Sequence, residues 1–388
     1  MNKRIYLDNA ASTPLSEEVL LTMNECMREL FGNPSSIHAD GRRAKAKVEE
    51  ARKQIAGCIG ASIGEIFFTS GGTESNNMAI RCAVRDLGVR RIISTKTEHP
   101  GVFRSIELAE KQGSDIQWLK VDHLGRPDYN QLEDLLRYNP DTKTLVSIMH
   151  ANNETGTLTD MEHIAGLCQT SRAYFHSDTV QTIGHFPIDV SKTNIHFLAG
   201  SAHKFHGPKG CGFIYIRNDA MLQPFIVGGS QERNMRAGTE NIYGIAGMAK
   251  ALELACENME KRRAYIEDLR SYFKNQLLER FEDIQFNGDQ ENYLYTILNV
   301  SFPPSEKSPM LLLHLDIAGI SASGGSACSS GAESHSHVLQ AIEADPDRKA
   351  IRFSFSHYNS KKEIDIVLNK LSEIVKEKKV IPVWKNGD

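Results

Sequence analysis

The chain has 388 residues, of which 40% are hydrophobic and 24% charged, the composition of a soluble globular protein with more chain than one compact domain usually holds. Its formal net charge of −4 argues against a nucleic-acid-binding protein, which normally has a basic excess. No run of 18 apolar residues and no apolar signal-peptide core is present, so we expect a cytoplasmic protein that does not associate with membranes.

Short apolar strands alternate with amphipathic helices between about residues 60 and 255. The expected strands are residues 65–69, 91–94, 145–149, 173–177, 195–200 and 211–216, and the expected helices include residues 74–87 and 162–171. This alternation predicts an α/β fold with a mostly parallel sheet covered by helices. Ligands of such sheets bind at the carboxyl ends of the strands.

A long helical stretch over residues 242–281 is expected to leave this sheet and enter a second unit. That unit is predicted to contain a strand at residues 295–300, a helix near 310–318, a Gly/Ser-rich loop, a strand at 350–355 and a final helix from residue 361. We therefore expect a large domain over residues 15–255 and a small α/β domain made of residues 1–14 and 256–388.

Lys204 lies in the stretch GSAHKFHGPKG, residues 200–210, at the end of a predicted buried strand. A lysine there is costly to keep charged and unpaired, so it is a candidate for covalent chemistry such as a Schiff base. The alternative is a partly exposed lysine that extends to water.

The stretch TSGGTESNN, residues 69–77, follows a predicted strand and opens a helix. Gly71 and Gly72 allow the backbone to approach an anion, and Thr73 offers a hydroxyl and an N–H group at the helix start. No lysine follows the glycines, so this is not a Walker A loop, and a single phosphate is the sharper prediction. The alternative is a helix cap with Thr73 as the N-cap residue.

Three further polar motifs also follow predicted strands. Asp178 in HSDTVQ needs a cationic partner if it is buried, and the protonated ring nitrogen of a cofactor would supply one; the alternative is a cap for the next turn. His99 in EHPGV could stack on a ring and move protons, or could be a solvent-facing loop residue. Asn152 and Asn153 in HANNETG could bind a ligand oxygen, or could serve turn formation alone.

One ligand would satisfy these motifs together. Pyridoxal 5′-phosphate (PLP) would place its phosphate on Thr73, its ring nitrogen on Asp178, its ring face on His99 and its aldehyde on Lys204. The separate alternatives would require several coincidences, so the motifs jointly predict a PLP site.

Cys328 differs from the other six cysteines, which lie in or beside apolar segments and are expected in the core. It lies in SGGSACSSG, residues 323–331, which we expect to be a mobile loop carrying an exposed nucleophilic thiol. The alternative is a fortuitous surface cysteine. A metal site with His335 and His337 is disfavoured because such a loop holds ligands poorly, and without any Cys-x-x-Cys pair we expect no metal.

Arg352 lies inside an apolar strand pattern, AIRFS, and therefore needs an anionic partner. A substrate carboxylate, held by two parallel hydrogen bonds, is the favoured partner. The alternative is an ion pair within the chain.

Ten motifs occur in an order that resembles cysteine desulfurases of the NifS/IscS type, members of the class V aminotransferase group of fold type I PLP enzymes. They extend from Tyr6 to about Ser356 and are YLDNAASTP, GNPSSIHADGR, FTSGGTESNN, EHPGV, HANNETG, HSDTVQ, SAHKFHGPKG, RAGTEN, SGGSACSSG and IRFSFS. The resemblance implies a large domain with a seven-stranded, mostly parallel sheet.

The resemblance also implies a role for each motif residue. Lys204 would hold PLP as an internal aldimine, beneath a stacked His99, with Asp178 on the ring nitrogen. The remaining contacts would be made by Gln181 and Asn153 (ring oxygen or substrate), by Gly72, Thr73, Ser201 and His203 (phosphate), by Thr239 (phosphate of the other subunit of a homodimer) and by Arg352 (substrate carboxylate).

The implied reaction converts L-cysteine to L-alanine and leaves a persulfide on Cys328. The sulfur would pass to an acceptor or an iron–sulfur scaffold protein, for iron–sulfur cluster biosynthesis or other products. Residues 332–337 and the pair Ser356-His357 depart from the pattern of the family, which leaves the acceptor open. The alternatives are a selenocysteine lyase, a related aminotransferase-type PLP enzyme, or a non-catalytic binding protein that would not need Lys204.

Overall fold

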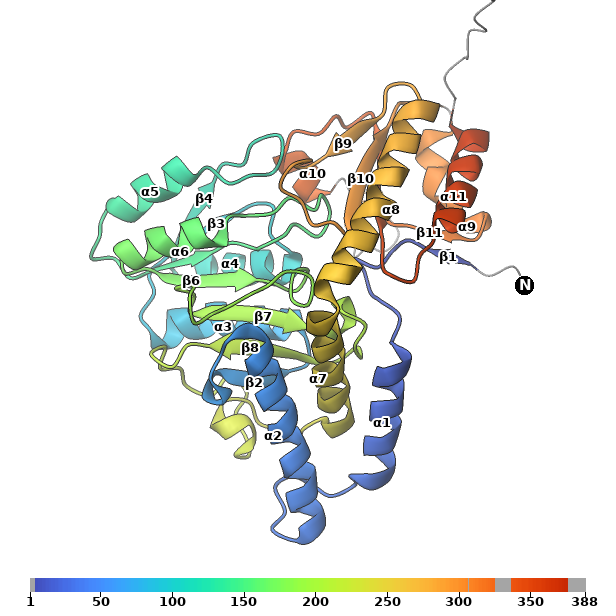
Figure 1. Cartoon of the computed structure of the whole chain (residues 1–388). Helices are drawn as coiled ribbons and strands as arrows, with labels where there is room; N and C mark the ends of the chain where they lie inside the picture. The colour runs from blue at the N-terminus through green and yellow to red at the C-terminus, as the bar shows by residue number, and fades with distance from the viewer. Residues whose placement is uncertain (1–3, 306, 325–335, 376–388) are drawn as a thin grey trace, which may run out of the picture.

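The computed structural model describes residues 4–305, 307–324 and 336–375, and its centre is a seven-stranded sheet (Figure 1). The strand order is β2 (Ile66–Thr69), β8 (Gly212–Ile216), β7 (Phe197–Ser201), β6 (Tyr174–Asp178), β5 (Thr144–Ser147), β3 (Arg91–Thr95) and β4 (Asp115–Leu119). β8 runs antiparallel to both of its neighbours, and the other pairs are parallel. The prediction of a mostly parallel α/β sheet is confirmed.

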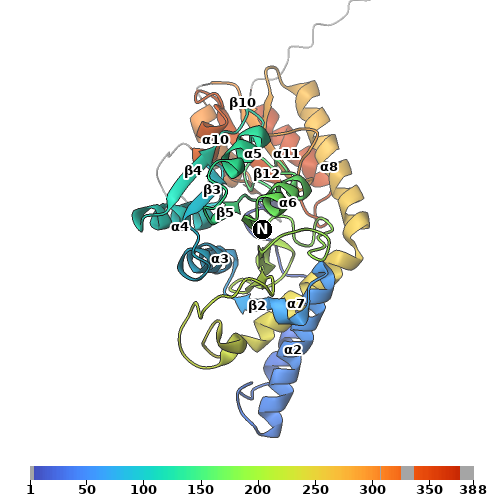
Figure 2. The same cartoon turned by 90° about the vertical axis from the view of Figure 1, so that its left-hand side faces the viewer.

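Helices cover both faces of this sheet. One face packs against α2 (Ala39–Ile59), α5 (Tyr129–Arg137), α6 (Met161–Thr170) and α7 (Ile242–Glu257). The other face packs against α3 (Gly72–Asp86) and α4 (Pro100–Lys111), which lie apart from α2 and α7 in Figure 2. Two separate apolar cores result, one on each face.

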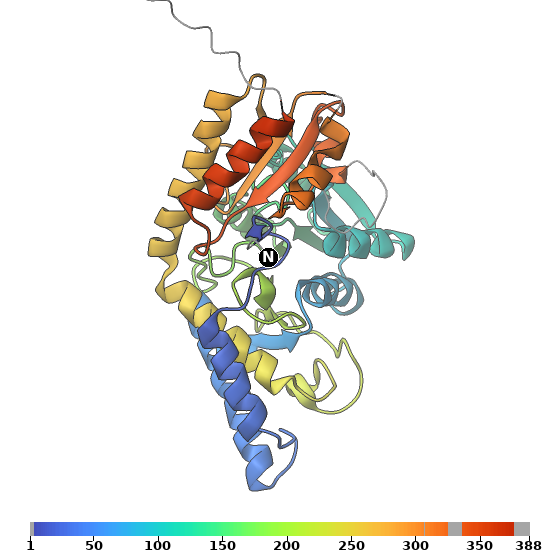
Figure 3. The ribbon, with the colours of Figure 1, turned by 90° about the vertical axis from the view of Figure 1, so that its right-hand side faces the viewer.

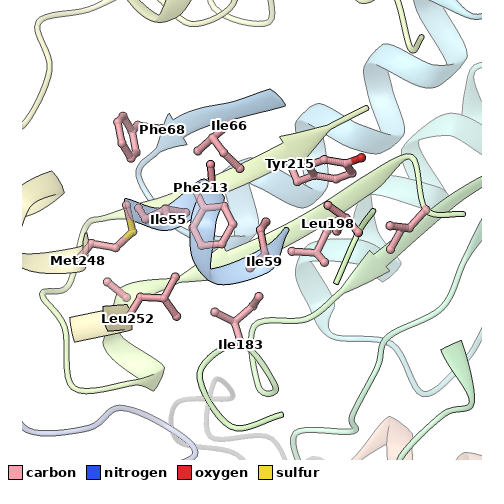
Figure 4. Packing of buried hydrophobic residues seen from close by; sticks show 14 of the residues in the cluster. Ile55, Ile59, Ile66, Phe68, Ile183, Leu198, Phe213, Tyr215, Met248 and Leu252 are labelled. Carbon is pink, nitrogen blue, oxygen red and sulfur yellow. The ribbon is translucent and has the colours of Figure 1, made fainter. Parts of the chain in front are cut away.

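Neighbouring residues of one strand contribute to different cores because side chains alternate along a strand. Ile92 packs with α3 and α4, whereas Ile93 packs on the opposite face. Figure 4 shows the core on the face covered by α2 and α7, where Phe213 of β8 packs beside Ile55 of α2 and Met248 of α7. Strands buried on both faces explain the nearly continuous apolar runs in the sequence.

A second unit has its own sheet and its own apolar core. The antiparallel order is β12 (Lys349–Ser354), β10 (Ile297–Phe302) and β9 (Gln285–Asn287). Around it lie α8 (Met259–Arg280), α9 (Leu311–Ile317), α10 (His337–Ala341) and α11 (Lys361–Ile374), and β1 (Ile5–Tyr6) pairs with β11 (Ile320–Ser321) (Figure 3). The predicted domain boundaries remain a proposal, which this separate core supports.

The prediction of one long helix over residues 242–281 is wrong in one respect, because this stretch forms two helices. α7 ends and α8 begins at Asn258, whose backbone has φ −107° and ψ 12°. Its side-chain Nδ2 donates to the carbonyl oxygen of Leu254 at 3.0 Å. An asparagine that hydrogen-bonds nearby backbone competes with the helical hydrogen bonds, which accounts for the break.

The α1 helix (Glu17–Glu29) packs on α7, and α1 and α2 together extend away from the second unit (Figure 3). Within the described part of the chain, we find no helix with the length and apolar character needed to cross a membrane.

Candidate active site

A cavity of about 310 Å³ opens at the carboxyl ends of the central strands. It brings together ten of the predicted site residues, which are Gly72, Thr73, His99, Asn153, Asp178, Gln181, Ser201, His203, Lys204 and Arg352. Asp178 is the last residue of β6 and Ser201 the last residue of β7, as the rule for parallel sheets requires. Ala10 and Ala11 of the N-terminal segment also line the cavity.

Lys204 lies at the end of a short 3₁₀ turn, Ala202–Lys204, directly after β7. Its Nζ donates hydrogen bonds to the carbonyl oxygens of Ala10 and Ala11, the latter at 2.9 Å. Its own carbonyl oxygen contacts Nε2 of His185 at 3.3 Å. The half-buried amine is therefore held at the cavity wall by the chain rather than extended into bulk water.

The start of α3 forms a cradle for an anion. Gly71 is the N-cap residue and the helix begins at Gly72, so the alternative in which Thr73 serves as the N-cap is wrong. A Cβ atom on Gly72 would lie 2.5 Å from Cγ2 of Val180, so any larger residue would force Val180 to shift. The unpaired N–H groups of the first turn of this 15-residue helix attract negative charge.

Asp178 is buried with both carboxylate oxygens engaged. Oδ2 accepts from Nδ2 of Asn76 at 2.7 Å, and Oδ1 accepts from the backbone N–H of Val180 at 2.9 Å. The hydrogen bond from Val180 is the turn cap that was the alternative for Asp178. The hydrogen bond from Asn76 comes from another residue that lines the cavity. Two donated hydrogen bonds hold the carboxylate in place, and its negative charge suits a cationic partner.

Behind Asp178 lies a chain of hydrogen bonds that the sequence analysis missed. Because Nδ2 of Asn76 donates to Asp178, its Oδ1 accepts from Nε2 of His176 at 3.1 Å. Nδ1 of His176 then accepts from the hydroxyl of Ser147 at 2.8 Å. Burial lowers the pKa of His176 to about 3, so this ring is neutral and orients Asn76 without adding charge. The only sequence signal was the position of Asn76 three residues after Thr73, on the same helix face.

His99 is the N-cap residue of α4, and it lines the cavity rather than facing solvent. Its Nδ1 accepts from the backbone N–H of Gly101 at 3.0 Å. Burial lowers the pKa of His99, while the nearby Asp178 partly opposes this shift. The neutral ring therefore carries its proton on Nε2.

The two asparagines of the HANNETG motif have different surroundings. Oδ1 of Asn152 accepts from the backbone N–H groups of Glu154 and Thr155, both at 2.9 Å, so turn formation explains Asn152. Asn153 instead lines the cavity, and its carbonyl oxygen accepts from Nη1 of Arg352 at 2.7 Å.

Two other polar residues complete the predicted cavity lining. Nε2 of Gln181 donates to the carbonyl oxygen of Ala10 at 3.0 Å. Burial lowers the pKa of His203 to about 4, so its ring is neutral beside the cradle of α3.

Arg352 reaches the cavity from β12 of the second unit, and its side chain is only 2% exposed. Nη2 lies 2.9 Å from Oδ1 of Asp8, so the alternative of an ion pair within the chain is confirmed, and the substrate carboxylate stays a prediction. Nε of Arg352 is buried and has no hydrogen-bond partner among the described residues. No sequence pattern indicated that Asp8 is the partner of Arg352.

Another residue missed from the sequence is Glu154, which also lines the cavity. Its Oε2 accepts from the hydroxyl of Ser336, and burial raises its pKa. His337, which follows Ser336 in the chain, contacts the carbonyl oxygen of Glu98 through Nε2 at 2.9 Å.

One predicted site residue in the described part of the chain, Thr239, is not brought into the cavity. Thr239 is exposed and is not part of the cavity lining, although Arg236 in the same motif pairs with Glu74 of α3 at 2.8 Å. Cys328 and residues 325–335 lie outside the described residues. Throughout residues 4–305, 307–324 and 336–375, no cluster of three or more His, Cys, Asp or Glu side chains is suited to hold a metal ion.

The residues present fit PLP. The cavity offers an amine for its aldehyde, a helix start for its phosphate and a buried, doubly hydrogen-bonded carboxylate for its ring nitrogen. The cavity also contains a guanidinium with an unused donor, which fits the carboxylate of an amino acid.

Comparisons with known proteins agree with this chemistry. Residues 5–367 match the family described as aminotransferase class V. The cysteine desulfurase IscS of Dictyoglomus turgidum is 44% identical over 99% of this chain and 98% of its own length. The putative cysteine desulfurase IscS 1 of Bacillus subtilis is 43% identical over 96% of this chain and 99% of its own length.

Solved structures give the same result. A NifS-like protein has a TM-score of 0.88 at 37% identity, covering 96% of this chain and 99% of its own. SspA in complex with cysteine has a TM-score of 0.79 at 32% identity, covering 92% of this chain and 100% of its own.

Proposed function

We propose roles for individual residues of this chain, which belongs to the aminotransferase class-V family and is a cysteine desulfurase. Cysteine desulfurases of this family depend on PLP, and we propose that this chain binds PLP through Lys204. The observation that carries the proposal is the single cavity that unites Lys204, Asp178, the start of α3 and Arg352.

The wall formed by the sheet would hold the cofactor. Lys204 would bind the aldehyde carbon, and Asp178 would keep the ring nitrogen protonated. His99 would stack on the ring, and Gln181 would contact the ring oxygen. The phosphate would be held by Gly72, Thr73, Ser201 and His203. The hydrogen bonds of Asn76 and Val180 to Asp178 support its role, because they orient the carboxylate.

When bound, PLP supplies an electron sink that acidifies the Cα proton of an attached amino acid. Lys204 would remove that proton and return it, because its Nζ is the basic group at the cavity wall. Neutral His99 would offer its Nε2 proton within the same cavity, a role supported by the hydrogen bond that Gly101 donates to Nδ1.

Arg352 would bind the substrate carboxylate, with the side chain of Asn153 beside it. The unused Nε donor and the near-complete burial of Arg352 support this role. A charge-assisted hydrogen bond in a buried site is strong and orients the amino acid.

Cys328 would take the sulfur. Its thiolate would attack the substrate sulfur, forming an S–S bond while the Cβ–S bond breaks. The electron pair of that bond stays on Cβ, which is then protonated, so the products are alanine and a persulfide on Cys328. The sulfur would pass to an acceptor or an iron–sulfur scaffold protein.

The test is to incubate the PLP-loaded protein with L-cysteine and measure alanine, sulfide and protein mass. We expect one added sulfur atom on the peptide that contains Cys328. Cys328→Ser should retain the cofactor absorption band and lose alanine formation, because a hydroxyl is a far weaker nucleophile than a thiolate. Cys58→Ser, at a partly buried cysteine away from the cavity, is the matched control. Equal alanine production by Cys328→Ser without added thiol would contradict this role.

We also propose a cytoplasmic homodimer in which Thr239 reaches the phosphate site of the partner subunit. The exposure of Thr239 outside its own cavity supports this arrangement. Sedimentation should give about twice the chain mass of 43.3 kDa. An active monomer would contradict the proposal.

A further inference from the structure

Arg352 already has a counter-ion before any substrate arrives. Its Nη2 lies 2.9 Å from Oδ1 of Asp8, and its Nη1 donates to the carbonyl oxygen of Asn153 at 2.7 Å. A guanidinium that is 2% exposed requires such a partner, because an unpaired buried charge is costly. The carboxylate of Asp8 thus neutralises the charge of Arg352.

The pairing leaves one donor unused. Nε of Arg352 is buried and has no partner within the described part of the chain. A buried donor without an acceptor is unfavourable, and Arg352 lines the cavity, so a small shift of its side chain would let a ligand carboxylate supply the missing acceptor. A ligand carboxylate can therefore join Asp8 at the guanidinium rather than replace it.

Asp8 is held firmly in this position. The hydroxyl of Ser323 donates to the same Oδ1 atom at 2.8 Å. The backbone of Asp8 forms a bridge with Ser354 of β12, the strand that carries Arg352. Turning the Asp8 side chain away from an incoming carboxylate would break its contacts with Arg352 and Ser323, so the two negative charges share one cation.

We infer that Asp8 is a positioning and specificity residue that orients Arg352 and weakens the binding of every ligand carboxylate at that guanidinium. The inference rests on the proposed role of Arg352. Substrate and product carry the same carboxylate, so Asp8 also promotes release of alanine. Like charges that share one partner repel, and the repulsion is strong in a buried site.

The experiment compares L-alanine with ethylamine, which is alanine without its carboxylate. Each is titrated into the PLP-loaded protein and binding is followed by the cofactor absorption band. Asp8→Asn keeps an acceptor oxygen for Arg352 but removes the charge. It should lower the dissociation constant of alanine about fivefold and leave that of ethylamine within about twofold. Ser323→Ala, which removes a hydrogen bond to the same oxygen without changing charge, should leave both within about twofold.

Asp8→Ser serves as the second uncharged variant if Asp8→Asn does not fold, and it should tighten alanine binding in the same way. Unchanged or weaker alanine binding, or equal tightening of ethylamine, would overturn the inference. Arg352→Lys distinguishes a failure of the inference about Asp8 from a failure of the proposed role of Arg352. If it weakens alanine binding while the Asp8 variants do not tighten it, only the inference about Asp8 fails. If it leaves alanine binding unchanged, the proposed role of Arg352 fails, and the inference fails with it.

Discussion

The two walls of the cavity differ in how completely their polar groups are satisfied. On the sheet wall, Asp178 has a donor on each oxygen, and Nδ1 of His99 accepts a backbone N–H group. On the wall formed by the second unit, Arg352 retains one buried donor with no partner among the described residues. The sheet wall is thus preorganised for a resident group, whereas the second wall keeps hydrogen-bonding capacity for a ligand that comes and goes.

Removal of the amine from the sheet wall should have the largest effect. Lys204→Ala should abolish the cofactor absorption band and lower activity by a factor on the order of 1,000 or more, because no other group replaces the amine. Absorption spectra and alanine assays measure both effects. Lys209→Ala, an exposed lysine five residues away, is the matched control. A retained band, with borohydride reduction trapping the cofactor on a different lysine, would contradict the assignment.

A change confined to the second wall should affect the substrate and spare the cofactor. Arg352→Lys replaces a planar fork by a point charge, and loss of the paired hydrogen bonds should cost about 2 kcal/mol, or about 30-fold in the KM for cysteine. The affinity for PLP should stay within about twofold. Arg104→Lys, at a side chain that is 73% exposed, is the control. A KM within about twofold of the wild type would show that Arg352 has a structural role only.

The smallest expected effect concerns the proton of His99 on the sheet wall. Burial lowers its pKa, so the neutral ring persists as the pH falls through the ordinary value of about 6.5. The acid limb of kcat/KM that reports this group should therefore lie below about pH 6.5. The stability contributed by the neutral ring should likewise be lost as the pH falls. His99→Gln should remove this limb from a profile measured between about pH 5 and pH 8. An acid limb above about pH 6.5, or one retained by His99→Gln, would contradict the assignment.

The sequence predicted that the polar residues of the sheet wall lie together in one cavity, whereas their chemical roles stay proposals. Thr73, His99, Asp178 and Lys204 each follow an apolar run, and the ends of parallel strands meet at one edge. The chain of hydrogen bonds behind Asp178 was missed because it joins α3 to the neighbouring strands through side chains, which no periodic pattern records.

The second wall was predicted only in part, for a different physical reason. Arg352 was recognisable as a charge within an apolar strand, but its partner Asp8 follows a strand of only two residues, which leaves no periodic signal. The break at Asn258 was missed as well, because a single asparagine within a helical composition is compatible with a continuous helix.

The pair of Asp8 and Arg352 joins positions that are 344 residues apart. During synthesis, the sheet that carries Asp178 and Lys204 leaves the ribosome long before β12 does. Contacts between distant segments require the closure of a long loop, so they form late in folding. A nascent chain can therefore complete the groups that would hold the cofactor while it still lacks the cation that would hold an amino acid. The order of translation thus separates the assembly of a cofactor site from the onset of substrate recognition.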